Sequence, residues 1–206
     1  LKLKEGVSLD HEGADTISLD VTTTDAGGLS RTETFTISVG DENEVATDVA
    51  LDNTSVAEND AGAVVGTLTT TDPDAGDTHT YAVSDDHFEV VDGQLKLKDG
   101  VSLDHEAADT ISLDVTTTDA GGLSRTETFT ISVGDENEVA TDIALDNTSV
   151  AENAAGAVVG NLSTTDPDAG DSHTYAVSDD RFEVVDGHLK LKDGVSLDHE
   201  AADTIS

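Results

Sequence analysis

Short acidic motifs recur at fixed places in the sequence, outside the stretches with strand-like patterns. They are VAEN at 56–59, TDPDAGD at 71–77, LDHE at 103–106, TDAGG at 118–122 and DENE at 135–138. The oxygen-bearing side chains that they contribute are Glu58, Asp72, Asp74, Asp104, Glu106, Asp119, Asp135, Asn137 and Glu138. All are hard oxygen donors, and the chain has no cysteine.

Crowding of this kind needs a balancing charge. Two unit charges about 4 Å apart repel by roughly 4 kcal/mol at an effective dielectric of about 20, and Asp72, Asp74 and Asp77 share one tight turn. Calcium takes six to eight oxygen ligands, supplied by carboxylates, amides and carbonyls. Several carboxylates that converge from separate loops therefore predict a Ca²⁺ site.

Each motif taken alone has a structural explanation that stays open. TDPDAGD also fits a type I turn with Pro73 at its second position, and Asp104 also fits the N-cap of a single helical turn. Asp119 and Asp135 are compatible with ordinary loops. An EF-hand is excluded, because the twelfth position counted from Asp72 is a valine and not the required glutamate. The calcium hypothesis depends on all five motifs occurring in one order.

The sequence is a tandem repeat. The segment that begins LKLK at Leu1 returns at Leu95 and again at Leu189, a period of 94 residues. Strand patterning breaks at DENEVATD (41–48 and 135–142), where polar linker residues gather. The predicted division is half a repeat at 1–47, a complete repeat at 48–141 and an incomplete repeat at 142–206.

The hydrophobic periodicity is two residues, which is typical of strands. Ile111, Leu113 and Val115 alternate with polar residues, and the stretch around Phe129 and Ile131 does the same. Asp92-Gly93 between strand-like flanks, at 90–97, predicts a type I′ hairpin. About seven short strands in 94 residues, with no segment that favours a long helix, predict an all-β fold of tandem, immunoglobulin-like β-sandwiches.

Composition limits the classes of function. A formal charge of −36 excludes nucleic acid as a partner. The hydrophobic fraction of 35% allows a core, although one with few aromatic residues. The sequence contains no run of 18 apolar residues, so it does not predict a membrane-spanning helix. The chain contains no methionine, which suggests a piece of a longer polypeptide.

The ordered motifs VAEN, DPD, LDHE, TDAGG and DENE resemble the cadherin repeat, in particular the cadherin-like repeats of large secreted bacterial adhesins and calcium-dependent surface lectins. The resemblance extends over essentially the whole chain. It implies seven-stranded Greek-key sandwiches joined end to end, with up to three Ca²⁺ ions at each junction. Cadherin linkers read DxNDN where this chain reads DENEV, so Glu44 and Glu138 replace an aspartate. We expect two ions at each junction, with three as the alternative.

The resemblance also implies a ligand set for each junction. At the first junction the set is Asp10, Glu12, Asp41, Asn43 and Glu44 from one repeat, with Asp72, Asp74 and Asp119 from the next. At the second junction it is Glu58, Asp104, Glu106, Asp135, Asn137 and Glu138, with Asp166 and Asp168.

The predicted function is a non-enzymatic, extracellular spacer or adhesion module, stiffened by Ca²⁺, of a secreted or cell-surface protein that acts in cell adhesion and biofilm. Its partners would be calcium ions, other copies of the repeat or cell-surface polysaccharide. The alternative is a calcium-dependent lectin module that binds acidic exopolysaccharide, although only Tyr81 and Tyr175 could offer an aromatic platform. Catalysis and zinc binding are disfavoured, because neither a catalytic triad nor clustered histidine and cysteine is evident. One chain's residues 1–47 could also complete another chain's incomplete repeat.

Overall fold

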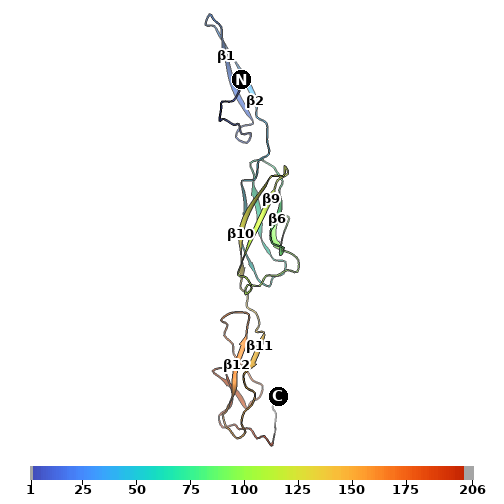
Figure 1. Ribbon diagram of the computed structural model, residues 1–206, viewed down its shortest axis with the longest axis vertical. Helices are drawn as coiled ribbons and strands as arrows, with labels where there is room; N and C mark the ends of the chain where they lie inside the picture. The colour runs from blue at the N-terminus through green and yellow to red at the C-terminus, as the bar shows by residue number, and fades with distance from the viewer. Residues whose placement is uncertain (1, 202–206) are drawn as a thin grey trace. The chain divides into compact units, whose positions relative to one another are not determined.

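The computed structural model describes residues 2–201 and divides the chain into two compact units, residues 1–134 and 135–206. Leu1 and residues 202–206, at the outer ends of the first and last predicted repeat segments, lie outside the described residues. The described residues form strands, turns and loops, with no helix among them (Figure 1). The prediction of an all-β fold is therefore confirmed.

The first unit begins with a two-stranded antiparallel sheet. Strand β1 (Thr16–Thr24) pairs with β2 (Ser30–Ser38), and Leu19 lies opposite Phe35. The tight turn between the two strands lies in the first copy of the TDAGG motif, where Asp25 Oδ1 accepts hydrogen bonds from the N–H groups of Gly27 (2.9 Å) and Leu29 (2.9 Å). We call these two strands the N-terminal hairpin.

Residues 48–134 of the same unit, here called the middle repeat, form two four-stranded sheets. One has the order β3 (Asp48–Leu51), β5 (Val64–Thr71), β8 (Gln94–Leu97) and β7 (Phe88–Val91). The other has the order β4 (Ser55–Ala57), β10 (Ser124–Gly134), β9 (Thr110–Thr118) and β6 (Thr80–Val83) (Figure 1). The chain changes sheet between β3, which is antiparallel to β5, and β4, which is parallel to β10.

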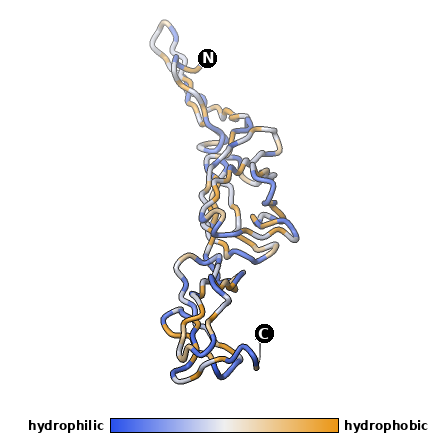
Figure 2. Tube along the Cα trace, turned by 60° about the horizontal axis from the view of Figure 1, so that its bottom comes forward, coloured by the Kyte–Doolittle hydropathy of each residue, from blue (hydrophilic) through white to orange (hydrophobic). Residues whose placement is uncertain are grey.

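The core of the middle repeat contains apolar side chains from both sheets. Leu113, Val115 and Ile131 are fully buried and belong to the same cluster as Leu95 and Phe88 from the opposite sheet. Hydrophobic and hydrophilic residues alternate along the trace (Figure 2), so each sheet gives one face to the core and the other to solvent. The predicted type I′ hairpin is confirmed, since Asp92 (φ 50°) and Gly93 (φ 78°) connect β7 and β8 in the left-handed region.

The second unit contains one sheet among its described residues. Its order is β11 (Asp142–Leu145), β12 (Val158–Thr165), β14 (His188–Leu191) and β13 (Phe182–Val185), which matches the β3-β5-β8-β7 sheet one period earlier. Residues 149–151 and 174–177 have no strand structure, although their counterparts 94 residues earlier form β4 and β6. In the middle repeat those two strands pair with β10 and β9, so strand formation here depends on a pairing partner.

Candidate metal centre

Three carboxylates meet where residues 1–47 contact the middle repeat. Glu12 lies in the turn before β1, Glu44 lies in the linker after β2, and Asp74 lies in the loop after β5. One oxygen from each lies within 4.8 Å of the other two. The Glu44 backbone N–H donates to Asp74 Oδ2 at 2.8 Å, which ties the linker to the loop of the next repeat. Oxygen ligands from two successive repeats therefore lie at one place.

The electrostatics of this cluster disfavour three ionised groups. Desolvation raises the pKa of Glu44, and the negative charges of Glu12, Asp74 and Asp10 raise it further. A raised folded-state pKa means that the stability contributed by protonated Glu44 is lost as the pH rises through that pKa. A bound cation would offset this repulsion at neutral pH.

The linker is also fixed through Asn43, whose amide donates to Asp119 Oδ2 at 3.1 Å. Asp119 is only 7% exposed. Although burial opposes its ionisation, the hydrogen bond from Asn43 and the backbone N–H groups of residues 121–123 lower the pKa of Asp119 below its usual value. A Cβ atom on Gly121 would overlap the Asn43 amide. The glycine of the TDAGG motif therefore makes room for the linker side chain.

The TDPDAGD loop has the turn geometry expected on structural grounds alone. Asp72 Oδ1 accepts the Asp74 N–H at 3.1 Å, and the His79 ring lies 2.9 Å from Asp72 Oδ2. The ring and carboxylate side chains are only 11% and 5% exposed, so the pair is largely shielded from water. His173 and Asp166 repeat the contact in the second unit at 2.7 Å. The turn interpretation and the ligand interpretation of this loop are thus compatible.

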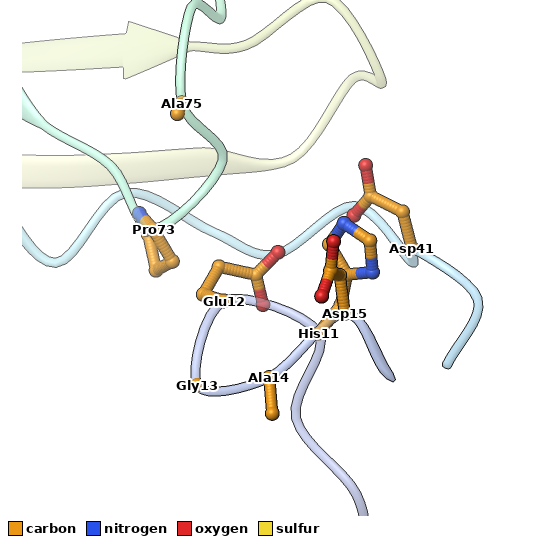
Figure 3. Close-up of a pocket in the computed structure, with 8 residues that line it drawn as sticks. All are labelled: His11, Glu12, Gly13, Ala14, Asp15, Asp41, Pro73 and Ala75. Carbon is orange, nitrogen blue, oxygen red and sulfur yellow. The ribbon is translucent and has the colours of Figure 1, made fainter. Parts of the chain in front are cut away.

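A shallow pocket beside the first cluster is lined by residues of both repeats (Figure 3). His11, Glu12 and Asp41 each bring one candidate ligand atom within 4.8 Å of the other two, and Pro73 lines the pocket from the next repeat. The Val39 carbonyl, 3.0 Å from His11 Nδ1, raises the pKa of that histidine, and Asp41 and Glu12 add to the shift. The histidine in this cluster is a feature that sequence reasoning missed. Asp10 Oδ1, by contrast, accepts a hydrogen bond from the Gly13 N–H at 3.1 Å.

A second cluster lies at the other end of the middle repeat. Glu58, Asp104 and Glu106 each place an oxygen within 4.8 Å of the others. Glu58 is 2% exposed, and its Oε2 accepts the His105 N–H at 2.7 Å. Asp104 Oδ1 caps the following turn by accepting the Ala107 N–H at 2.9 Å. The structure thus brings together three of the six residues that the repeat at 48–141 was predicted to give to the second junction.

The second unit holds the remaining predicted ligands and one set that was not predicted. Glu138 N–H donates to Asp168 Oδ2 at 2.7 Å, and Asp168 N–H donates to Asp166 Oδ1 at 3.1 Å. Asp135 and Asn137 are exposed at the start of this unit. The set that was not predicted consists of Glu152, Asp198 and Glu200 and repeats the Glu58 cluster one period later. One carboxylate oxygen of each residue lies within 4.8 Å of the other two. The repeat period could have located it.

The donor sets fit a hard divalent cation. The candidate ligand atoms are carboxylate oxygens from separate loops, and those of Glu58, Asp74 and Asp104 accept hydrogen bonds from backbone N–H groups. Carboxylates of this kind suit Ca²⁺. Asp168 Oδ1 is buried and has no hydrogen-bond partner among the described residues. An unpaired buried carboxylate oxygen is costly unless something else binds it.

The chain matches no protein-family model. Among solved structures it resembles protocadherin gamma B7 extracellular cadherin domains 1–4 (24% identity, TM-score 0.68, covering 94% of this chain and 52% of that one). It is similar to mouse protocadherin-24 EC1–3, with 24% identity and a TM-score of 0.67, over 95% of this chain and 71% of that one. It is also similar to the protocadherin gamma B4 extracellular domain, with 25% identity and a TM-score of 0.66, over 95% of this chain and 35% of that one. The chain spans about half the length or less of the first solved structures that it matches.

These likenesses define the class of fold. The chain has a cadherin-like, all-β sandwich fold, as the sequence predicted. The described residues include no apolar helix of membrane-spanning length.

Proposed function

We propose that the chain is a calcium-binding, cadherin-like repeat module that acts as an extracellular spacer or adhesion segment of a large secreted or cell-surface protein of the bacterial adhesin type. The observation that carries the proposal is the cluster of Glu12, Glu44 and Asp74, in which two successive repeats supply oxygens within 4.8 Å. The cadherin-like fold supports it, and so does the second cluster at Glu58.

The bound ion would supply positive charge that links the two repeats. Glu12 and Glu44 would hold it from the first repeat and Asp74 from the second, while Asn43 and Asp119 keep the linker in place. Without the ion, like charges push the linker away from the loop. With it, the linker and loop form one stiff connection, which is the property that a spacer needs.

Calorimetric titration with Ca²⁺ and Mg²⁺ tests the proposal. We expect Ca²⁺ to bind at the cluster of Glu12, Glu44 and Asp74 and Mg²⁺ to bind more weakly, because Mg²⁺ keeps several of its waters. At a calcium concentration about 100 times Kd, binding should stabilise the fold by about 2.7 kcal/mol relative to chelator. Hydrogen exchange of the linker amides at 41–47 should also slow down.

A matched pair of variants locates the site. Asp74→Asn should weaken the binding step that includes this residue by about tenfold or more, since a charged ligand is lost. Asp92→Asn removes the same charge from the β7–β8 turn, where asparagine is tolerated, and should leave binding unchanged. Absence of a binding heat in millimolar calcium, or equal affinity in both variants, would contradict the proposal.

The lectin alternative has less support. The hydroxyls of Tyr81 and Tyr175 lie 2.7 Å from Thr70 and Thr164, and both tyrosines are partly buried. Neither ring is a freely exposed platform for a sugar. A glycan array with and without calcium separates the two functions, because a spacer should bind no glycan in either condition.

A further inference from the structure

A histidine lies among carboxylates beside the first carboxylate cluster. His11 and Glu12 belong to the turn before β1, and Asp41 lies in the linker after β2. One candidate ligand atom from each of these three residues lies within 4.8 Å of the other two. Figure 3 shows the three side chains gathered on one side of the pocket, with Asp15 next to them. The set therefore combines one imidazole nitrogen with carboxylate oxygens.

The backbone fixes the orientation of this imidazole. His11 Nδ1 lies 3.0 Å from the Val39 carbonyl oxygen. A carbonyl oxygen can only accept a hydrogen bond, so Nδ1 carries the proton, and in the neutral ring Nε2 keeps its lone pair. Histidines that bind metals commonly donate their other ring N–H to a backbone carbonyl in this way, which holds the ring in place. The ring is thus oriented as a nitrogen ligand would be.

The same anchoring occurs in the middle repeat. His105 Nδ1 lies 2.8 Å from the Val133 carbonyl oxygen, and this histidine is partly buried like its counterpart. Because the middle repeat contains both sheets, the anchoring belongs to the assembled repeat and not to the N-terminal hairpin alone. The same three residue types also recur in the sequence as His105, Glu106 and Asp135. The anchored histidine is therefore a regular feature of the repeat.

The nitrogen distinguishes this set from the carboxylate cluster that would hold calcium. Ca²⁺ takes oxygen ligands, whereas imidazole suits Zn²⁺ and neighbouring transition metals. Zinc is bound by histidine nitrogen and by aspartate or glutamate oxygen, and water can complete its coordination. We propose that His11, Glu12 and Asp41 form a second metal site, which binds a divalent transition metal such as Zn²⁺. The sequence disfavoured zinc because carboxylates, and not a second histidine or a cysteine, complete the set.

The ion would connect the turn before β1 to the linker. His11 and Glu12 would hold it from the turn and Asp41 from the linker, so it would fix the linker to its own repeat. Asp15 adds negative charge at the same pocket. Glu12 belongs to both this set and the cluster with Asp74, so metal binding at one site should change the affinity of the other.

Calorimetric titration with Zn²⁺ tests the proposal in a chain that keeps one copy of the histidine. His105→Gln/His199→Gln removes the two later copies, and glutamine can still donate to the Val133 carbonyl. This chain should bind one Zn²⁺ tightly. Adding His11→Gln should remove that site, and adding Asp41→Asn should weaken it by about tenfold or more. Calcium-free buffer is used, so the outcome does not depend on whether the calcium proposal holds.

The control is His87→Gln in the same background, because His87 lies in a turn, is exposed and faces Asp85, and its loss should leave zinc binding unchanged. Nitrogen NMR of the parent chain, labelled on histidine, keeps the test valid if a variant fails to fold. Zinc should shift the Nε2 resonance of His11 and leave Nδ1 protonated. Equal zinc affinity after His11→Gln, or a His11 Nε2 resonance that zinc does not move, would overturn the proposal.

Discussion

Residues 142–206 of the second unit repeat residues 48–112 of the middle repeat with few substitutions, yet the two segments differ in structure. Thr80–Val83 form β6 in the middle repeat, whereas residues 174–177 form no strand. Leu95 is fully buried, whereas its counterpart Leu189 is half-buried. The local sequence is the same, so the difference comes from the presence or absence of β9 and β10 as pairing partners.

One sheet forms in both regions, so it does not depend on β9 and β10. Strands β3, β5, β8 and β7 have the same order and register as β11, β12, β14 and β13. Leu97 and Leu191 are both fully buried. This sheet forms from contacts within about 50 residues, whereas β4 and β6 need strands from the far end of the repeat. The two sheets of the sandwich therefore differ in whether they need pairing between strands that are far apart in the sequence.

The largest expected effect comes from supplying the missing strands. A chain extended after Ser206 by the sequence of residues 113–141 should convert residues 149–151 and 174–177 into strands, because β9-like and β10-like partners then exist. Hydrogen exchange at Ala176 should slow by about two orders of magnitude or more. Unchanged exchange would show that the difference between the two regions has another cause. An extension with scrambled order is the control.

Core substitutions at equivalent positions should give the next largest effect. Val49→Ala should cost about 2 kcal/mol, because it leaves a cavity beside a buried strand. Ile143→Ala removes a larger group but should cost less than about 0.5 kcal/mol, since this side chain is 63% exposed. Chemical denaturation measures both. Equal losses would mean that Ile143 is buried in solution.

A glycine pair tests the linker contact. Gly121→Ala should destabilise the first unit by about 1–3 kcal/mol, because the added methyl group overlaps the Asn43 amide. Gly27→Ala, in the equivalent turn of the N-terminal hairpin, should change stability by less than about 0.5 kcal/mol, because only the Asp25 side chain approaches it. Thermal unfolding provides the measurement. A neutral Gly121→Ala would indicate that the linker lies elsewhere.

Much of the fold could be predicted from local patterns. Alternation at 111–115 identified β9 and its buried face, and Asp92-Gly93 identified the turn between β7 and β8. The change of sheet between β3 and β4 could not be predicted, because no pattern in residues 52–54 distinguishes one partner from the other. Nor could the loss of strand structure at 174–177, which depends on strands that are far away in the sequence.

The candidate ligands could be identified as residue types, but their partners could not. The resemblance to cadherin repeats implied Glu12, Glu44 and Asp74 as part of a larger ligand set, and the structure places one oxygen of each of these three close together. The contact between His79 and Asp72 gave no sequence signal, because a histidine seven residues away is not distinctive. Carboxylate clusters follow from loop geometry, which is fixed only when the sheets are assembled.

The smallest expected effect concerns a turn that differs by one charged residue between the two regions. Hydrogen bonds from Arg181 lower the pKa of Asp179 to about 2, whereas in the middle repeat His87 faces Asp85 across 2.7 Å. Because the unfolded aspartate has a pKa of about 3.9, the stabilisation of Asp179 is full above that pH and is lost as the pH falls toward about 2. Arginine stays charged at neutral pH, whereas histidine loses its charge above about pH 6.5.

Arg181→His should therefore lower the Tm of the second unit by about 1 °C at pH 7 and by less at pH 5, because the pair is exposed and histidine is charged only at the lower pH. His87→Arg should do the reverse in the middle repeat, with a small gain at pH 7. Calorimetric scans at the two pH values, with both substitutions compared in the same buffers, provide the check. A loss for Arg181→His that is larger at pH 5 than at pH 7 would contradict the assignment, because the histidine charge would then be destabilising the turn.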